Sequence, residues 1–163
     1  MIPSTSVRDA RAEDLPRARE LAVETGLFSD QESHEVEQQL AQVVDGNESG
    51  SVVVAETDDA VVAAAYFAPE PFSDRCWNLY FLAVDPRHQG QGLGRLLVNE
   101  VETRLIALGS REARVLLIET SSTDAFVGTR AFYARRGYVQ EATIRDYYGP
   151  EDSKVVFWKL LNA

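Results

Sequence analysis

The sequence has very little cysteine and histidine, and this scarcity limits the metal and redox chemistry that it can support. Cys76 is the only cysteine among 163 residues, so an internal disulfide is excluded and a reducing compartment is expected. The only histidines are His34 and His88, and together they make no recognisable metal-ligand pattern. We therefore expect a protein without a metal site.

Long hydrophobic runs and targeting segments are also missing. The longest apolar run, residues 60–68, is too short to span a bilayer, and the first residues lack the basic and apolar pattern of a signal peptide. No repeat or low-complexity segment interrupts the chain. With 45% hydrophobic residues, this length predicts one globular domain over residues 1–163, cytoplasmic and without a membrane partner.

Basic residues are outnumbered, and the excess of acid is confined to one half of the chain. The net charge is −10, yet residues 1–75 hold 5 basic and 16 acidic side chains, whereas residues 76–163 hold 11 and 10. This balance argues against nucleic acid as a partner, because neutralising phosphates requires a basic face. The acidic half either attracts cationic molecules or only keeps the protein soluble, and the sequence supports both interpretations.

Glycines gather in one short segment, which is the most informative part of the sequence. Gly90, Gly92 and Gly94 stand between an apolar run at residues 79–84 and a helical stripe of apolar residues within 96–108. Glycine permits positive φ, and the free N–H groups at a helix N-terminus attract phosphate. The pattern of strand, glycine-rich turn and helix predicts a ligand with a pyrophosphate group.

Two common phosphate-binding motifs do not fit this segment. A P-loop requires Lys and then Ser or Thr after its last glycine, but Arg95 and Leu96 follow Gly94. A Rossmann fingerprint requires a third glycine at the place where this chain has Arg95. A tight strand-to-helix turn that binds no ligand is the structural alternative.

The apolar periodicity and the turn residues predict an α+β fold, with a mixed, mostly antiparallel sheet of about seven strands and flanking helices. Strands are expected at residues 5–8, 51–56, 60–67, 76–84, 114–120, 138–147 and 154–161. Helices are expected at residues 13–25 and 31–44, and after the glycine-rich turn up to Gly109. A last short helical region, capped by Thr123 or Asp124, is expected to end at Gly137.

Two segments of the chain together resemble the GNAT superfamily of N-acetyltransferases. Residues 84–94 are similar to its acyl-CoA signature, Gln/Arg-x-x-Gly-x-Gly/Ala, which Gln89, Gly92 and Gly94 match. Residues 129–138 are similar to its Phe-Tyr-x-x-x-Gly-Phe/Tyr segment. The segments stand in the family's order, and the resemblance covers nearly the whole chain. It implies acetyl-CoA as the cofactor, held in a cleft where two central strands splay apart.

The resemblance also implies which residues contact the cofactor. Main-chain groups at the end of the strand would pair with the pantetheine arm, and backbone amides of the turn would hold the pyrophosphate. The implied contacts are Leu82, Ala83, Val84, Gln89, Gly90, Gln91, Gly92, Leu93, Gly94, Arg95 and Thr129. Candidates for the 3′-phosphate, or ordinary surface charges, are Arg87, Arg95, Arg130, Arg135 and Arg136.

By the same resemblance, Tyr133 is the general acid that protonates the leaving CoA thiolate. A phenol titrates near 10, so it keeps its proton at pH 7 and can donate it. The alternative is that Phe132 and Tyr133 are both core aromatics. Adjacent helical residues point about 100° apart, so one of them can face the core and the other the cleft.

Glu119 is the candidate general base. It follows four apolar residues, 115–118, of a predicted strand, and partial desolvation there would suit a base. Some members of the family use a glutamate on this strand, and others use acids on the preceding strand, where this chain has Tyr80 and Phe81. Two alternatives stay open: water relays the proton, or Glu119 only marks the solvent end of the strand.

The resemblance places the acceptor between the connection of the first two helices and the last hairpin. The candidate residues Phe28, Asp146, Tyr147 and Tyr148 combine aromatic and acidic groups, which suit a cation with an apolar body, although packed turn residues would look the same. The resulting hypothesis is an acetyl-CoA-dependent N-acetyltransferase that acts by direct attack of a primary amine of a small molecule or amino acid. A protein or peptide acetyltransferase and a non-catalytic acyl-CoA-binding module are the alternatives, and the resemblance is compatible with a homodimer.

Overall fold

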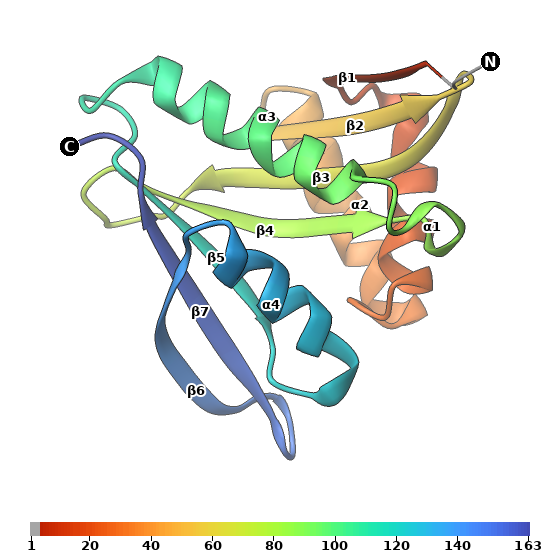
Figure 1. Cartoon of the computed structure of the whole chain (residues 1–163). Coiled ribbons are helices and arrows are strands. Elements are labelled where there is room, and N and C mark those ends of the chain that lie inside the picture. The colour runs from red at the N-terminus through yellow and green to blue at the C-terminus, as the bar shows by residue number, and fades with distance from the viewer. Residues whose placement is uncertain (1–3) are drawn as a thin grey trace. The chain divides into compact units, whose positions relative to one another are not determined.

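A computed structural model describes residues 4–163, and its seven strands form one mixed sheet in the order β1-β2-β3-β4-β5-β7-β6 (Figure 1). The strands are β1 (Thr5–Asp9), β2 (Ser51–Thr57), β3 (Ala60–Pro69), β4 (Cys76–Val84), β5 (Val115–Ser121), β6 (Val139–Gly149) and β7 (Asp152–Leu160). The α-helices are α1 (Leu15–Glu24), α2 (Asp30–Val44), α3 (Leu93–Leu108) and α4 (Val127–Arg135). Short 3-10 helices are η1 (Ala12–Asp14), η2 (Pro86–His88) and η3 (Asp124–Phe126). The predicted fold class is confirmed: β4 and β5 run parallel, and the pairs β1–β2, β2–β3, β5–β7 and β6–β7 are antiparallel.

The element boundaries follow the sequence pattern, with small differences that have local causes. The first helical segment starts as the 3-10 turn η1, so α1 itself begins at Leu15. Helix α2 begins at Asp30 because Ser29 caps it: the Ser29 hydroxyl accepts from the Glu32 N–H, and the Glu32 carboxylate accepts from the Ser29 N–H. Thr123 precedes η3 as predicted, but its side chain makes no capping hydrogen bond.

The described residues divide into two compact units. The first comprises residues 4–68 and Tyr80–Arg104, and the second comprises Pro69–Leu79 and Leu105–Ala163. Strand β4 contributes its first residues to the second unit and its last residues to the first. The glycine-rich turn therefore belongs to the first unit, whereas the candidate acid and base belong to the second.

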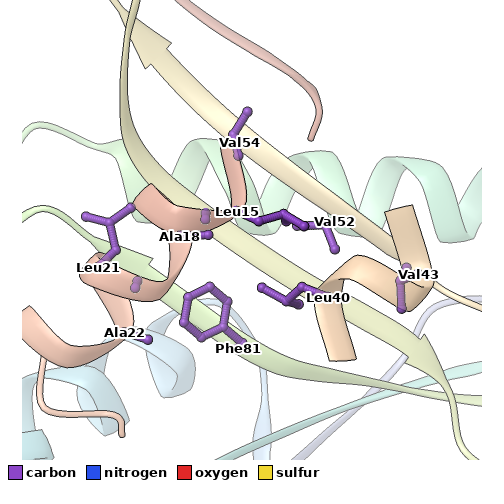
Figure 2. Close-up of a cluster of buried hydrophobic side chains, with 11 residues drawn as sticks. Leu15, Ala18, Leu21, Ala22, Leu40, Val43, Val52, Val54 and Phe81 are labelled. Atoms are coloured by element: carbon purple, nitrogen blue, oxygen red, sulfur yellow. The ribbon is translucent and has the colours of Figure 1, made fainter. Parts of the chain in front are cut away.

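The core of the first unit lies between helices α1 and α2 and the strands that they cover (Figure 2). Leu21 of α1 and Leu40 of α2 are fully buried and pack with Val54 of β2 and Phe81 of β4. The neighbouring Val53 points to the opposite face of β2 and is also fully buried. Figure 1 shows α3 along that other face, which explains why β2 reads as a continuous apolar run.

The second unit is built on β5, which has a neighbouring strand on each side. Its parallel pairing with β4 runs from the pair Cys76–Val115 to the pair Leu79–Ile118. On the other side, antiparallel pairing with β7 runs along the whole of β5. Helix α4 packs against these strands, and β6 is the edge strand, with nearly all of its residues exposed (Figure 1).

The helices are short relative to a membrane. The longest described helix, α3, has 16 residues, and crossing a bilayer takes about 20 apolar residues. Within residues 4–163, none of the helices combines the length and the apolar character that a membrane span requires.

The packing of α2 on the first core can be tested by truncating Leu40. Leu40→Ala is expected to lower the free energy of unfolding by about 2–5 kcal/mol, because it leaves a cavity that the neighbours cannot fill. Ile106→Ala, at a position of α3 that is 49% exposed, is the matched control and should stay within about 0.5 kcal/mol of the wild type. Urea unfolding followed by circular dichroism measures both, and equal losses would contradict this core assignment.

Candidate functional site

The segment between β4 and α3 turns through the left-handed region at two of its three glycines. Gly90 has a φ of 77° and Gly92 a φ of 84°, whereas Gly94 lies in the first turn of α3. A Cβ built on Gly90 or Gly92 would meet no atom within 4 Å apart from its chain neighbours. These two positions therefore require glycine for its backbone conformation, and open space lies beside their main chain. The exposed residues 89–92 lead into a helix N-terminus whose first N–H groups lack intrahelical partners.

A buried carboxylate, Asp85, anchors the start of this turn. Its Oδ1 accepts from the backbone N–H of Arg87 at 2.9 Å, and its Oδ2 accepts from the guanidinium groups of Arg87 and Arg17, each at 2.7 Å. The N–H of Asp85 donates to the Val62 carbonyl at 2.8 Å. The hydrogen bonds from Arg87 outweigh the effect of burial and hold the pKa of Asp85 well below the usual aspartate range. The carboxylate therefore stays charged and ties the turn to α1 and β3.

The last residues of β4 lie directly before this anchor. Leu82 and Val84 are half-buried, whereas the alternate residues Phe81 and Ala83 are buried in the core. The Gln89 side-chain amide donates to the Val84 carbonyl at 3.3 Å. A ligand that pairs with the main chain of Val84 would therefore share this carbonyl with Gln89 or displace the glutamine.

The five arginines considered for an anionic group differ in their contacts. Arg87 is paired with a buried carboxylate, Arg130 donates to two main-chain carbonyls at and just after the end of β5, and Arg136 lies over an aromatic ring. Arg95 and Arg135 are exposed to solvent. Arg95, in the first turn of α3, has the exposure that contact with a phosphate requires.

Tyr133 lies on the inner face of α4 and is 4% exposed. Its ring contacts those of Phe132, Tyr138 and Phe157, with 5.2, 5.9 and 5.9 Å between centroids. Burial raises the pKa of Tyr133 well above the ordinary tyrosine value, and no charged or hydrogen-bonding neighbour contributes to this shift. The hydroxyl therefore keeps its proton at physiological pH. Thr129, one turn earlier on α4, is half-buried.

Glu119 lies near the carboxyl end of β5, and each of its carboxylate oxygens has a different donor. Oε2 accepts from the ammonium of Lys154 at 2.9 Å, and Oε1 accepts from the Asn78 side-chain amide at 3.0 Å. The same amide nitrogen donates to Glu70 at 2.7 Å. The Glu119 side chain keeps an exposed fraction of 21%. Although two carboxylates meet here, residues 4–163 contain no group of three or more acidic, histidine or cysteine side chains that could hold a metal ion.

Side chains alternate along β5 and β7, and this alternation places Glu119 and Tyr133 on opposite faces of the pair. Glu119 is opposite Val156, and the preceding Ile118 is opposite Phe157. Consecutive residues of a strand point to opposite faces, so Glu119 points away from the face that carries Phe157. Because Tyr133 packs on Phe157, α4 covers the face that Glu119 does not occupy.

The hairpin of β6 and β7 brings two of the predicted acceptor residues next to the ion pair of Glu119 and Lys154. Tyr147 and Tyr148 are 55% and 47% exposed, with their ring centroids 5.0 Å apart. The Lys154 ammonium lies 4.0 Å from the centroid of the Tyr147 ring, so a cation of the chain itself occupies that ring face. Partial burial, together with the Glu119 carboxylate, raises the pKa of Tyr148 to about 12.

The other two predicted acceptor residues have structural contacts of their own. The Asp146 carboxylate accepts from the Glu151 N–H at 3.0 Å and so closes the turn between β6 and β7. Phe28 is half-buried in the first unit and packs against Phe81, with ring centroids 6.4 Å apart. Both positions are explained by these contacts without a ligand.

Three residues that the sequence analysis did not select organise these contacts: Asp85, Asn78 and Lys154. Asp85 stands directly before Pro86, and an aspartate before proline is typical of a capped turn, so its role was readable. Asn78 is a polar residue within an apolar strand, which indicates a buried hydrogen-bonded group. Lys154 gives no such signal, because its position beside Glu119 depends on the register of β5 and β7.

Comparison with protein families gives one match over most of the chain. The model of the Acetyltransferase (GNAT) family matches residues 12–138, which include the glycine-rich turn, β5 and α4. A solved structure from Desulfovibrio desulfuricans, described as an acetyltransferase of the GNAT family, has a TM-score of 0.83 and 28% identity. That likeness covers 97% of this chain and 99% of the other.

More distant solved structures share the fold. The ribosomal-protein-S18-alanine N-acetyltransferase from Escherichia coli has a TM-score of 0.77 and 20% identity, over 98% of this chain and 96% of that one. A GNAT family acetyltransferase from Elizabethkingia anophelis, with acetyl-CoA bound, has a TM-score of 0.74 and 15% identity, over 96% and 98% of the two chains. Their shared fold spans nearly the full length of all three proteins.

The anchoring role of Asp85 predicts a pH-dependent loss of stability. Because folding lowers the pKa of Asp85, its contribution is fully present above the unfolded value near 4 and is lost as the pH falls toward the lower folded value. Asp85→Asn is expected to lower the free energy of unfolding by about 2 kcal/mol at pH 7, and the difference from the wild type should narrow below about pH 4.

Urea unfolding at a series of pH values measures this difference. Asp74→Asn is the control, because Asp74 also pairs with an arginine but its side chain is 65% exposed. That control should have little effect on stability. A constant difference between Asp85→Asn and the wild type from pH 7 down to pH 3 would exclude the charged anchor.

Proposed function

The chain belongs to the acetyltransferase (GNAT) family, and we propose that it acetylates a primary amine of a small molecule or amino acid. As a member of this family it is an acyltransferase that uses acetyl-CoA. Acetyl-CoA supplies an acetyl group activated as a thioester. In the proposed reaction the amine nitrogen attacks the acetyl carbonyl, the C–N bond forms as the C–S bond breaks, and CoA leaves as a thiolate.

The observation that carries the proposal is the turn from Asp85 to Gly92 with the N-terminus of α3 behind it. The two left-handed glycines leave open space beside the main chain, so a ligand can approach the backbone amides closely. Unpaired N–H groups and the helix dipole favour a pyrophosphate at such a position. We assign the cofactor to main-chain groups of residues 82–84 and 89–95, together with Thr129.

Tyr133 is our candidate for the acid that protonates the leaving thiolate. Its burial keeps the hydroxyl protonated, which is the state that a general acid needs. Its ring is also packed among aromatic side chains, which limits its motion. The two interpretations of this residue from sequence are compatible, because a core ring can carry a hydroxyl at the edge of the core.

Glu119 is our candidate for the base. A lysine-like amine, with a pKa near 10.4, arrives protonated and must lose its proton before it can attack. The amine and the thiolate require proton transfers in opposite directions. Glu119 and Tyr133 point to opposite faces of the β5–β7 pair, and this arrangement supports separate groups for the two transfers.

The acceptor class is inferred from the groups around Glu119. Glu70 and Glu119 carry two negative charges against one positive charge on Lys154, so the surroundings favour a cation. The exposed rings of Tyr147 and Tyr148 offer apolar area beside this charge. We therefore propose a primary amine with an apolar part as the acceptor.

Thiol release from acetyl-CoA, measured with a panel of amines, amino acids and peptides, tests the function. Turnover with at least one small primary amine or amino acid is expected, and it should exceed turnover with peptides. Turnover restricted to peptides would overturn the proposed acceptor class. Tight binding of CoA without turnover of any acceptor would identify an acyl-CoA-binding module instead.

The role of the glycine-rich turn is tested by Gly92→Ala. An L-residue in the left-handed region costs about 1–2 kcal/mol, so the turn should relax and CoA should bind about tenfold more weakly. Calorimetric titration with CoA measures the affinity. Gly128→Ala in α4, where the added Cβ also meets no atom within 4 Å, is the control and should leave the affinity unchanged. Unchanged affinity in a folded Gly92→Ala variant would refute the proposed pyrophosphate site.

The acid is tested by Tyr133→Phe, which removes the hydroxyl and keeps the ring. We expect kcat to fall by about 10²-fold, with little change in the KM for acetyl-CoA, because general acids typically contribute 10²–10⁴-fold. Tyr138→Phe removes the hydroxyl of a neighbouring buried tyrosine and is the matched control. Thiol-release kinetics compare the two variants, and a full kcat in Tyr133→Phe would exclude this residue as the acid.

A further inference from the structure

A lysine and an asparagine hold the proposed base from two neighbouring strands. We propose that Lys154 of β7 and Asn78 of β4 are positioning residues that fix the orientation of the Glu119 carboxylate toward the acceptor amine. The inference rests on the proposed function, in which Glu119 is the base. Neither residue is assigned contact with the reacting atoms; both act through Glu119.

Both oxygens of the Glu119 carboxylate have a donor. One oxygen receives the Lys154 ammonium at 2.9 Å and the other receives the Asn78 amide at 3.0 Å. Donors on both oxygens restrict rotation about the last side-chain bond of Glu119. Each carboxylate oxygen has two lone pairs, so one acceptor position on each oxygen stays available for the proton of an amine.

The Lys154 ammonium is itself held by its surroundings. Lys154 is 8% exposed and lies on the ring of Tyr147, 4.0 Å from its centroid. Burial lowers the pKa of Lys154, but the hydrogen bonds and charges of Glu119 and Tyr147 outweigh burial, and the net effect is a rise. A lysine stem that is packed on an aromatic ring and paired with a carboxylate holds its partner in one place.

Lysine is a rare residue in this chain. The chain contains 14 arginines and only two lysines, Lys154 and Lys159. Arginine would occupy two carboxylate oxygens at once through its planar fork, whereas a lysine ammonium binds as a point charge. Lysine at position 154 thus leaves the second oxygen of Glu119 to Asn78.

The Asn78 side chain contains an unsatisfied buried atom. Asn78 is fully buried, and its side-chain oxygen has no hydrogen-bond partner among the described residues. An unpaired buried acceptor is destabilising, so an apolar residue would be the more stable choice for packing alone. The Asn78 side-chain amide donates hydrogen bonds to Glu119 and Glu70, and these bonds explain why an asparagine stands at this position. The Lys154–Glu119 ion pair is partly buried, and such a pair is weak evidence of stabilisation, so stability alone does not account for Lys154.

The pairing can be measured without turnover, because the chain has only two lysines. Labelling lysine with ¹⁵N gives two side-chain ammonium signals, and Lys159→Met assigns them. The titratable groups near the pair are Tyr147 and Tyr148 on β6 and Glu70 beside Asn78. In Glu119→Gln the Lys154 signal should titrate at lower pH than in the wild type. Burial lowers the pKa of Lys154, and the substitution removes the carboxylate that raises it. An unchanged titration would overturn the pairing.

The positioning role is tested by a double-mutant cycle in thiol-release assays, with the acceptor that gives the fastest turnover in the screen. Lys154→Met is expected to lower kcat by about 10- to 100-fold with the KM for acetyl-CoA nearly unchanged, because small misplacements cost up to 10²-fold. In the Glu119→Gln background the same change should cause no further loss. Asn78→Leu should behave in the same way, and Lys154→Arg should recover part of kcat.

Lys159→Met, on the same strand and without a described contact to Glu119, is the matched control and should keep the wild-type kcat. An equal loss from Lys154→Met in both backgrounds would show a purely structural role and overturn the inference alone. A wild-type kcat in Glu119→Gln would overturn the base assignment and the inference with it. If urea unfolding shows that Lys154→Met does not fold, Lys154→Gln takes its place in the cycle.

Discussion

The alternation of side chains along β5 and β7 is the constraint on which the proposed chemistry depends. It places Glu119 with Lys154 on one face of the strand pair, and Phe157 with Tyr133 of α4 on the other. A register shift by one residue would move every side chain of a strand to the opposite face. The same pairing therefore maintains the core of the second unit and keeps the proposed acid and base apart.

Two of the buried polar groups among residues 4–163, Asp85 and Asn78, lie next to the parts of the proposed site. Asp85 is buried but fully satisfied, with Arg87 and Arg17 around its carboxylate, and it lies directly before the glycine-rich turn. Asn78 is buried with one atom unpaired, and it lies beside the proposed base. The first arrangement holds a main-chain turn in place, and the second gives up some stability to hold a side chain. Apolar packing alone would fix neither the conformation of this turn nor the orientation of the Glu119 carboxylate.

Much of the fold could be predicted from the sequence, whereas the roles of the candidate site residues stay predictions. The strands were predicted from apolar periodicity. For β4 the predicted ends, Cys76 and Val84, are those of the structure, because a mostly apolar run indicates a buried strand. Tyr133 was proposed as the acid through a motif, but its burial results from contacts with Tyr138 and Phe157 and could not be read from the neighbouring residues. Asp146 was predicted to contact the acceptor, but in the structure its carboxylate closes the turn between β6 and β7.

The sequence by itself determined the glycine-rich turn, because the positive φ at Gly90 and Gly92 is a local conformation that glycine adopts without strain, and two sequence motifs indicated the family. The tertiary structure decided which groups surround Glu119. Asn78, Glu119 and Lys154 lie on three strands that are far apart in the chain, and hydrogen-bonded register alone brings them together. A register between distant strands depends on the whole sheet, so no local pattern encodes it.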